Sequence, residues 1–142
     1  MTPEPIQKRS IEDVVLSFSG SYQQKLDNKR RVSISHPFHK KMRMRNGSHH
    51  KHIYLLPDQL EGRFVINIYD PRYLSNNTSF SRYDDLLECM LDKQHRIQIP
   101  QNLMDYASLT SPVTLSSAPN GDYIYIAPSG FSPAKPNLRV AD

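Results

Sequence analysis

Two short stretches of the chain carry an aspartate and an arginine four residues apart, and both pairs could do the same chemistry. Asp27 precedes Arg31, and Asp92 precedes Arg96. An aspartate can accept hydrogen bonds from backbone N–H groups two residues on and thereby stabilise a tight turn. It can also hold the stem of the arginine while the fork of N–H groups faces outward toward phosphate. The simpler interpretation, an Asp–Arg salt bridge across a hairpin, is compatible with this one.

The two turns belong to a repeat with an offset of 65 residues, the separation of Asp27 and Asp92. The shared frame is Leu-Asp-x-x-x-Arg, a β-branched residue, a polar residue and isoleucine, over residues 26–34 and 91–99. In both copies the alternation after the arginine puts the aliphatic side chains on one face. We therefore predict a turn followed by a strand in each copy.

Each copy continues into a predicted short helix, because a proline follows the strand and is tolerated at the first helical position. In the first copy Pro37 takes that position, with Phe38 and Met42 four apart on one face. In the second copy Pro100 does the same for Leu103, Met104, Tyr106 and Ala107.

The other segments are predicted mainly as strands, at 14–18, 21–26, 53–56 and 64–69, with turns at Pro57-Asp58 and Glu61-Gly62. Asn120-Gly121 between the apolar-rich stretches 113–115 and 123–126 is a strong hairpin signal. Residues 71–83 are predicted as a linker and 84–90 as one or two helical turns. We expect a single domain over 14–128, made of repeats at about 14–70 and 84–128. Residues 1–13 are expected to form a flexible tail and 129–142 a disordered one.

The composition is that of one compact domain without a membrane segment. The chain has 142 residues, 37% of them hydrophobic, and no tryptophan, which suits a modest core and favours burial of further surface against a second copy. The N-terminus lacks a signal-peptide pattern, and no apolar stretch approaches a membrane span. A single cysteine, Cys89, fits a reducing compartment. We expect a cytoplasmic protein.

The positive charge is concentrated in one block. Residues 28–56 contain eight lysines and arginines, five of the six histidines and no acid. Subtracting eight charges from the total of +4 leaves the rest of the chain at −4. Such a block attracts a phosphate backbone and releases its counterions on binding; the alternative is a solvated, solubilising loop.

These residues resemble the MraZ family of the AbrB-type swapped-hairpin superfamily. The resemblance rests on Phe18-x-Gly20 followed by Leu26-Asp27-x-x-x-Arg31-Val32-x-Ile34. It rests equally on Glu88-x-x-Leu91-Asp92-x-x-x-Arg96-Ile97-x-Ile99-Pro100-x-x-Leu103 and on Tyr106-Ala107-x-Leu109 before the hairpin. It covers residues 16–45 and 84–127.

The resemblance implies a β-rich α+β fold in which two pseudo-repeated hairpin-helix units form a swapped-hairpin, AbrB-like barrel. It places the two Asp-x-x-x-Arg turns side by side on one surface, which rings of protomers present to DNA. Such proteins regulate transcription by binding G-rich direct repeats upstream of a cell-division and cell-wall gene cluster. Arg31 and Arg96 would then face DNA, with Asp27 and Asp92 as their turn-forming partners and Lys29 at a commonly basic position.

The chain departs from the family pattern at the residue before each arginine. The family usually has glycine there, whereas this chain has Arg30 and His95. Glycine adopts positive φ without cost, so we expect a different or mildly strained turn. In the first copy Ser35 stands where the family tends to have proline, and Pro37 comes two residues later.

Metal binding and catalysis find less support in the sequence. His49, His50 and His52 lack a nearby cysteine or carboxylate, so they make a poor closed metal site; as phosphate donors they would gain charge as the pH falls. Cys89 lies in an apolar stretch typical of a buried residue. Phosphate-loop, hydrolase-elbow and metalloprotease motifs are absent from the sequence. We expect no metal, no cofactor and no enzymatic activity.

The predicted function is sequence-specific binding of double-stranded DNA by a nucleoid-associated homo-oligomer. The alternative is an oligomeric protein-interaction module, antitoxin-like or a scaffold, without specific DNA binding. DNA binding predicts that the arginines and the basic block share one face, whereas the alternative predicts that they scatter. The predicted DNA-binding residues are Lys29, Arg30, Arg31, Lys93, His95 and Arg96 at the turns, and Lys40, Lys41, Arg43 and Arg45 in the block.

Overall fold

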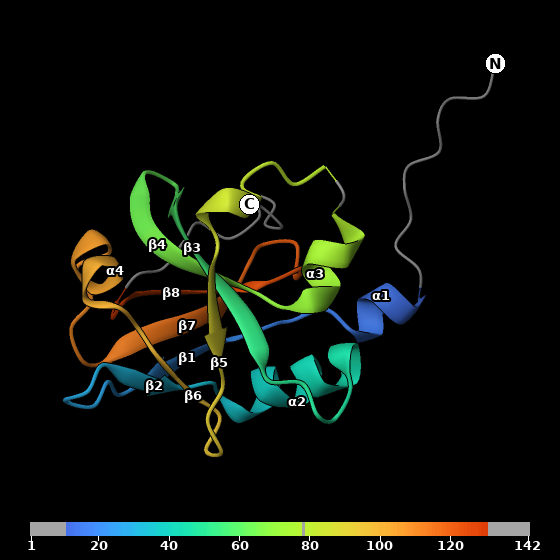
Figure 1. The fold of residues 1–142 in the computed structure, drawn as a ribbon, viewed down its shortest axis with the longest axis horizontal. Helices are drawn as coiled ribbons and strands as arrows, with labels where there is room; N and C mark the ends of the chain where they lie inside the picture. Colours follow the sequence, from blue (N-terminus) through green and yellow to red (C-terminus); the bar gives the residue numbers. More distant parts are fainter. Residues whose placement is uncertain (1–10, 78, 131–142) are drawn as a thin grey trace, which may run out of the picture.

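The chain folds as a β-rich α+β protein with antiparallel strand pairing (Figure 1). The computed structural model describes residues 11–77 and 79–130, and within them it has four α-helices, one 3₁₀ turn and eight strands. The helices are α1 (Ile11–Val15), α2 (His36–Asn46), α3 (Pro71–Asn76) and α4 (Gln101–Tyr106), and the 3₁₀ turn is η1 (Tyr83–Asp85).

Six strands form the larger sheet, in the order β1-β7-β8-β4-β3-β5. Their bounds are β1 (Ser21–Gln24), β3 (His52–Leu60), β4 (Arg63–Tyr69), β5 (Leu87–Met90), β7 (Val113–Ser117) and β8 (Ile124–Pro128). The pairs β1–β7 and β3–β5 each join a strand from one half of the chain to a strand from the other. Within the described residues the order ends on β1 and β5, so these strands do not close a barrel.

A separate two-stranded sheet is formed by β2 (Arg31–Ser33) and β6 (Arg96–Gln98), one from each copy of the repeat. Val32 lies opposite Ile97 at the centre of the ladder, and both side chains are buried. The predicted strands after the two turns are therefore confirmed, and each is paired with its counterpart in the other copy.

One main core cluster lies between these elements and draws on both halves of the chain, from Phe18 to Ile126. Phe38 of α2 is fully buried there and meets the rings of Phe18 and Tyr22 edge-on. Burying a side chain of this size stabilises the fold by roughly 1.5–3 kcal/mol. The core thus fixes α2 against the sheets.

The two predicted helices are present, each displaced by one residue at its start. The first begins at His36, with Ser35 as its N-cap and Pro37 within the first turn. The second begins at Gln101, with Pro100 itself as the N-cap. Proline fits both places because the first backbone N–H groups of a helix have no partner inside it.

The predicted strands 21–26, 53–56 and 64–69 and the final hairpin are also confirmed. β3 is longer than predicted and runs through Pro57, so only Glu61-Gly62 forms the turn to β4. In the hairpin, Gly121 has a positive φ, and its N–H and C=O bond to Ala118 and Phe18. A Cβ at this position would lie 3.0 Å from the Phe18 carbonyl oxygen, so the close approach requires glycine.

Three predictions for the irregular segments are wrong. Val14 and Val15 belong to α1 instead of a strand; Glu12 and Asp13 lie in its first turn, where acidic residues complement the helix dipole. The predicted linker contains α3, whose N-cap Asp70 accepts a hydrogen bond from the Tyr73 N–H. In the stretch 84–90, which is predicted to be helical, residues 87–90 form the strand β5 instead, because the free edge of β3 offers them hydrogen-bonding partners.

The tail predictions fall mostly outside the described residues. Residues 11–13 of the predicted N-terminal tail lie in α1, and residues 1–10 are not described. Of the predicted C-terminal tail, only Ser129 and Gly130 are described, and they form a turn. In the described ranges, no helix has the length and apolar character that a membrane span requires.

Candidate nucleic-acid interface

The two Asp-x-x-x-Arg turns have the same hydrogen bonds. Oδ1 of Asp27 accepts from the backbone N–H groups of Lys29 and Arg31, and Oδ2 accepts from Nε of Arg31 at 2.6 Å. In the second copy, Oδ1 of Asp92 accepts from Gln94 and Arg96, and Oδ2 accepts from Nε of Arg96 at 2.8 Å. These are the bonds that the sequence predicts, and each carboxylate fixes both its turn and its arginine.

Both aspartates are held in the ionised form. The backbone N–H of Arg31 is the main reason that the pKa of Asp27 lies below its ordinary value, although partial desolvation opposes the shift. Desolvation by itself raises the pKa of Asp92, but the backbone and side-chain hydrogen bonds from Arg96 outweigh it and lower the pKa overall. The turns therefore keep their charge pairing throughout the neutral range.

The residue before each arginine adopts the left-handed conformation, with φ of 63° at Arg30 and 60° at His95. A side chain at such a position costs about 1–2 kcal/mol relative to glycine. Each of the two side chains contacts the other half of the chain: Nε of Arg30 donates to the Ile99 carbonyl, and the His95 ring lies against the His39 ring at an interplanar angle of 34°. These contacts offset the strain, and they explain how the chain tolerates non-glycine residues there.

The backbone at these positions joins the two copies symmetrically. Ile99 donates its N–H to the carbonyl of Arg30, and Ile34 donates its N–H to the carbonyl of His95, both at 2.9 Å. The two turns therefore flank the β2–β6 ladder at opposite ends, in a pseudo-twofold arrangement (Figure 1).

The two arginines project from the same face of that ladder. Successive side chains of a strand point to opposite faces, and Val32 and Ile97 point into the core. Arg31, opposite Gln98, and Arg96, opposite Ser33, therefore lie on the outer face. They are diagonal neighbours, a relation that puts Cα atoms roughly 7–8 Å apart and Cβ atoms somewhat closer.

The outer ends of the arginines are available for a ligand. Their side chains are 31% and 26% exposed, and each uses Nε for its aspartate. The Nη atoms of Arg31 and Arg96 have no hydrogen bond to any of the described residues. Gln98 on the same face was missed by the sequence analysis, although the alternation that placed Arg96 also places it; its amide donates to the carbonyl of Lys29.

The basic block is divided among four places, including an interior one for Arg45, contrary to the single face that the sequence analysis expected. Arg43 and Lys51 line a cavity with Lys93 and His95 of the second turn. Lys40 and Lys41 line a different hollow beside Phe18 and Tyr22, where Nζ of Lys41 donates to the Val15 carbonyl. Lys29 is exposed at the tip of the first turn. Lys93, at the tip of the second turn, is also exposed but lies outside the block.

The prediction that Arg45 contacts DNA is wrong, because its side chain is only 6% exposed. Its Nε and Nη2 bind the two carboxylate oxygens of Asp70 at 2.6 and 3.0 Å, and its guanidinium lies over the Phe18 ring. Helical spacing could have revealed this, since Arg45 follows Phe38 by seven residues and Met42 by three and so shares their buried face.

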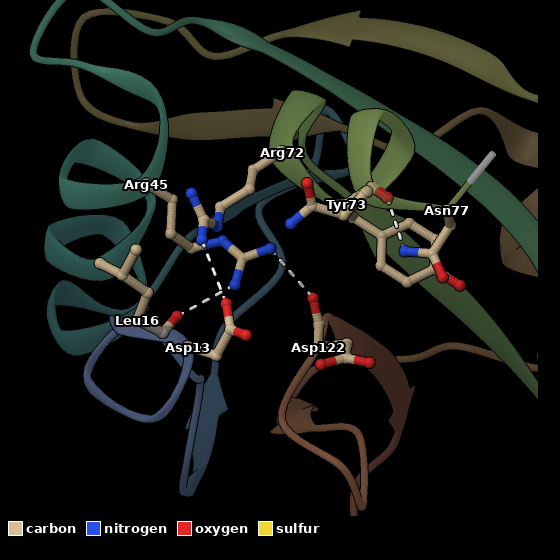
Figure 2. A pocket seen from close by; sticks show the side chains of 8 residues that line it. Asp13, Leu16, Arg45, Arg72, Tyr73, Asn77 and Asp122 are labelled. Atoms are coloured by element: carbon tan, nitrogen blue, oxygen red, sulfur yellow. Dashed lines mark hydrogen bonds and ion pairs between the residues drawn. The ribbon is translucent and has the colours of Figure 1, made fainter. Parts of the chain in front are cut away.

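Arg45 also borders a polar hollow of about 340 Å³ between α1, α3 and the loop before β8 (Figure 2). Figure 2 shows Arg45 and Arg72 side by side, with Asp13 and Asp122 below them. Arg72 binds Asp13, and Arg45 donates to the carbonyls of Leu16 and Asp122. The arginines around this hollow are paired within the chain, and their contacts attach α1 and α3 to the core.

His39 is buried beneath the second turn, its ring 3.5 Å from that of His95 between centroids. Burial, followed by the nearby His95 and Arg43, lowers the pKa of His39 from 6.5 to about 4. His36 and His50 act in the same direction. The neutral ring is therefore the folded form at pH 7.

We expect this ring to make the protein sensitive to acid. Between pH 6.5 and 4 the unfolded chain protonates His39 and the folded chain does not, so lowering the pH favours unfolding. The free energy of unfolding should fall by roughly 1–3 kcal/mol over this window in excess of the fall in His39→Leu. Urea titrations of the wild type and His39→Leu at several pH values would measure this difference. The same dependence of the free energy of unfolding on pH in both proteins would contradict the prediction.

Two further observations concern candidate metal ligands and the single cysteine. No group of three or more His, Cys, Asp or Glu in these ranges is arranged to hold a metal ion. Burial, assisted by Glu88, raises the pKa of the Cys89 thiol, so it is a poor nucleophile at neutral pH.

Comparison with known proteins gives no family: no protein-family model matches the chain, and no curated protein is significantly similar to it.

Proposed function

We propose that this chain is a sequence-specific DNA-binding transcription regulator similar to MraZ, which acts as a homo-oligomer on the nucleoid and has no enzymatic activity. One observation carries the proposal: the paired strands β2 and β6 present Arg31 and Arg96 on one outer face, each held by its aspartate. A fixed guanidinium with free Nη atoms is suited to the two acceptors of a guanine edge.

The surroundings of the two arginines support contacts to the DNA backbone as well. Lys29 and Lys93 stand exposed at the turn tips, and Arg43 is exposed beside the second turn. Contacts of this kind position a protein on the duplex without reading its sequence. The arginines would supply the specificity and the lysines the larger part of the affinity.

The pseudo-twofold pairing of the two copies supports a swapped-hairpin arrangement of the AbrB type. One chain offers two arginines to the duplex, a small footprint. Oligomerisation would repeat that footprint along the DNA and raise the affinity through effective concentration. The open edges at β1 and β5 are surfaces through which protomers could meet.

The experiment is a fluorescence-anisotropy titration of two labelled duplexes, one with G-rich direct repeats and one scrambled, at two salt concentrations. We expect tighter binding to the repeats and a fall in affinity with salt, with a logarithmic slope of about −0.9 for each phosphate contacted. Equal binding of both duplexes would reduce the function to nonspecific binding. No binding at low salt would reject the proposal.

The alternative of a protein-interaction module is favoured by two observations. The basic block is divided among separate places, and part of the surface is apolar. The side chains of Ile11, Val14 and Val15 on α1 are exposed, as is Met44 on α2, and clustered exposed apolar residues mark interaction surfaces. If the duplex does not bind in the DNA titration, a pull-down with the wild type and with Ile11→Asp/Val14→Asp as baits tests this function. A partner protein that the wild type retains and the variant does not would support it.

A further inference from the structure

A second site lies beside the second turn, in a cavity of about 220 Å³. Its walls are α2, the segment 48–51 after that helix, and the turn that precedes β6. These segments come together at one edge of the molecule (Figure 1). The proposed guanine contacts do not use this cavity, because neither Arg31 nor Arg96 lines it.

The permanent charges around the cavity are almost all positive. Arg43, Lys51 and Lys93 each come from a different wall and are exposed. Asp92 is the single acid in the lining. Its carboxylate already accepts hydrogen bonds from Gln94 and from both the backbone and the side chain of Arg96. Because Asp92 is already engaged by Arg96, the lining has no further carboxylate to balance its three cations.

Four histidines complete the lining: His39, His49, His50 and His95. Nε2 of His50 is buried and has no hydrogen-bond partner in the described part of the chain. Burial is the largest cause of the low pKa of His39, and the nearby His95 and Arg43 lower it further.

The size of the cavity limits the ligand. Pockets for complete organic ligands usually measure about 300–1,000 Å³, and this one is smaller. Lysine and arginine are the usual partners of phosphate, and a ring N–H can donate to its oxygens without carrying charge. A compact anion with several acceptor oxygens meets all of these conditions.

We propose that this cavity binds one phosphate group, held by Arg43, Lys51 and Lys93 together with ring N–H donors of the lining histidines. The phosphate has two sources. A backbone phosphate of the duplex is one of them and rests on the proposed DNA-binding function. A free phosphate compound is the other and does not depend on it.

The test is a titration of the full-length chain with inorganic phosphate by calorimetry, against sodium chloride at the same ionic strength. Saturable binding is expected in the wild type, weakened about tenfold or more in Arg43→Gln and in Lys93→Gln, since a hydrogen bond to a charged group contributes about 1.5–3 kcal/mol. Lys25→Gln, an exposed lysine outside the cavity, should bind as the wild type does. Circular dichroism would verify that each variant is folded.

A second measurement distinguishes the two sources. If phosphate competes with the duplex more strongly than chloride does, the cavity takes a backbone phosphate; saturable binding without competition identifies a free phosphate compound. Failure of the duplex to bind would reject the proposed DNA-binding function. The phosphate titration would then still show whether the cavity binds phosphate. The proposal is overturned if phosphate acts only as chloride does, or if both variants bind phosphate with wild-type affinity.

Discussion

Replacing Asp70 with alanine is expected to lower the free energy of unfolding by about 3–5 kcal/mol, the usual cost of leaving one member of a buried ion pair without its partner. The side chain of Asp70 is 1% exposed, and its carboxylate accepts from Nε and Nη2 of Arg45 and from Nδ2 of Asn46. It also caps α3 by accepting from the Tyr73 N–H at 2.9 Å. The substitution strands the Arg45 guanidinium in the interior and removes the helix cap together.

Chemical denaturation with urea would measure this loss. Asp85→Ala is the matched control, since Asp85 is also ion-paired, to Arg82, but its side chain is 58% exposed; such pairs contribute about 0–1 kcal/mol. A double variant, Asp70→Leu/Arg45→Met, should recover much of the loss, because apolar replacement of both partners removes the unpaired charge. Equal small losses in Asp70→Ala and Asp85→Ala would contradict our account of Arg45 as an internal residue.

The second large effect concerns recognition: the double variant Arg31→Ala/Arg96→Ala is expected to lose its preference for the G-rich duplex. Each bidentate arginine–guanine contact discriminates against a wrong base by about 1–3 kcal/mol. Loss of either arginine should therefore reduce the preference by roughly tenfold to a hundredfold, with a larger effect for both. Binding to the scrambled duplex should change much less, since Lys29, Lys93 and Arg43 remain.

The alanine variants leave Asp27 and Asp92 without their arginines, so a conservative pair is needed beside them. Arg31→Lys/Arg96→Lys retains the charge and loses the planar fork; it should keep the salt-dependent affinity and lose the preference. Arg82→Ala, which removes an exposed, ion-paired arginine at the N-cap of η1, is the matched control. Wild-type preference in the lysine double variant would show that charge alone is sufficient and would reject the assignment to guanine.

The sequence by itself determined the local parts of the site. The Asp-x-x-x-Arg turns could be predicted because the aspartate bonds to backbone groups only two and four residues away. The strands after them followed from the alternation at Val32 and Ile97, and the final hairpin from Asn120-Gly121. The absence of glycine before each arginine correctly indicated strain, which appears as positive φ at Arg30 and His95.

The tertiary structure alone decided which of these residues act together. The pairing of β2 with β6 put Arg31 and Arg96 on one face, and it is a contact between segments 65 residues apart. β5 formed because β3 offered a free edge, a partner that no local pattern of 84–90 indicates. The cations between Lys40 and Lys51 carry the same charge, but packing of α2 directs Arg45 inward and Arg43 toward the cavity. Local hydrogen bonds can be deduced from spacing, whereas exposure and partners depend on what folds against each side chain.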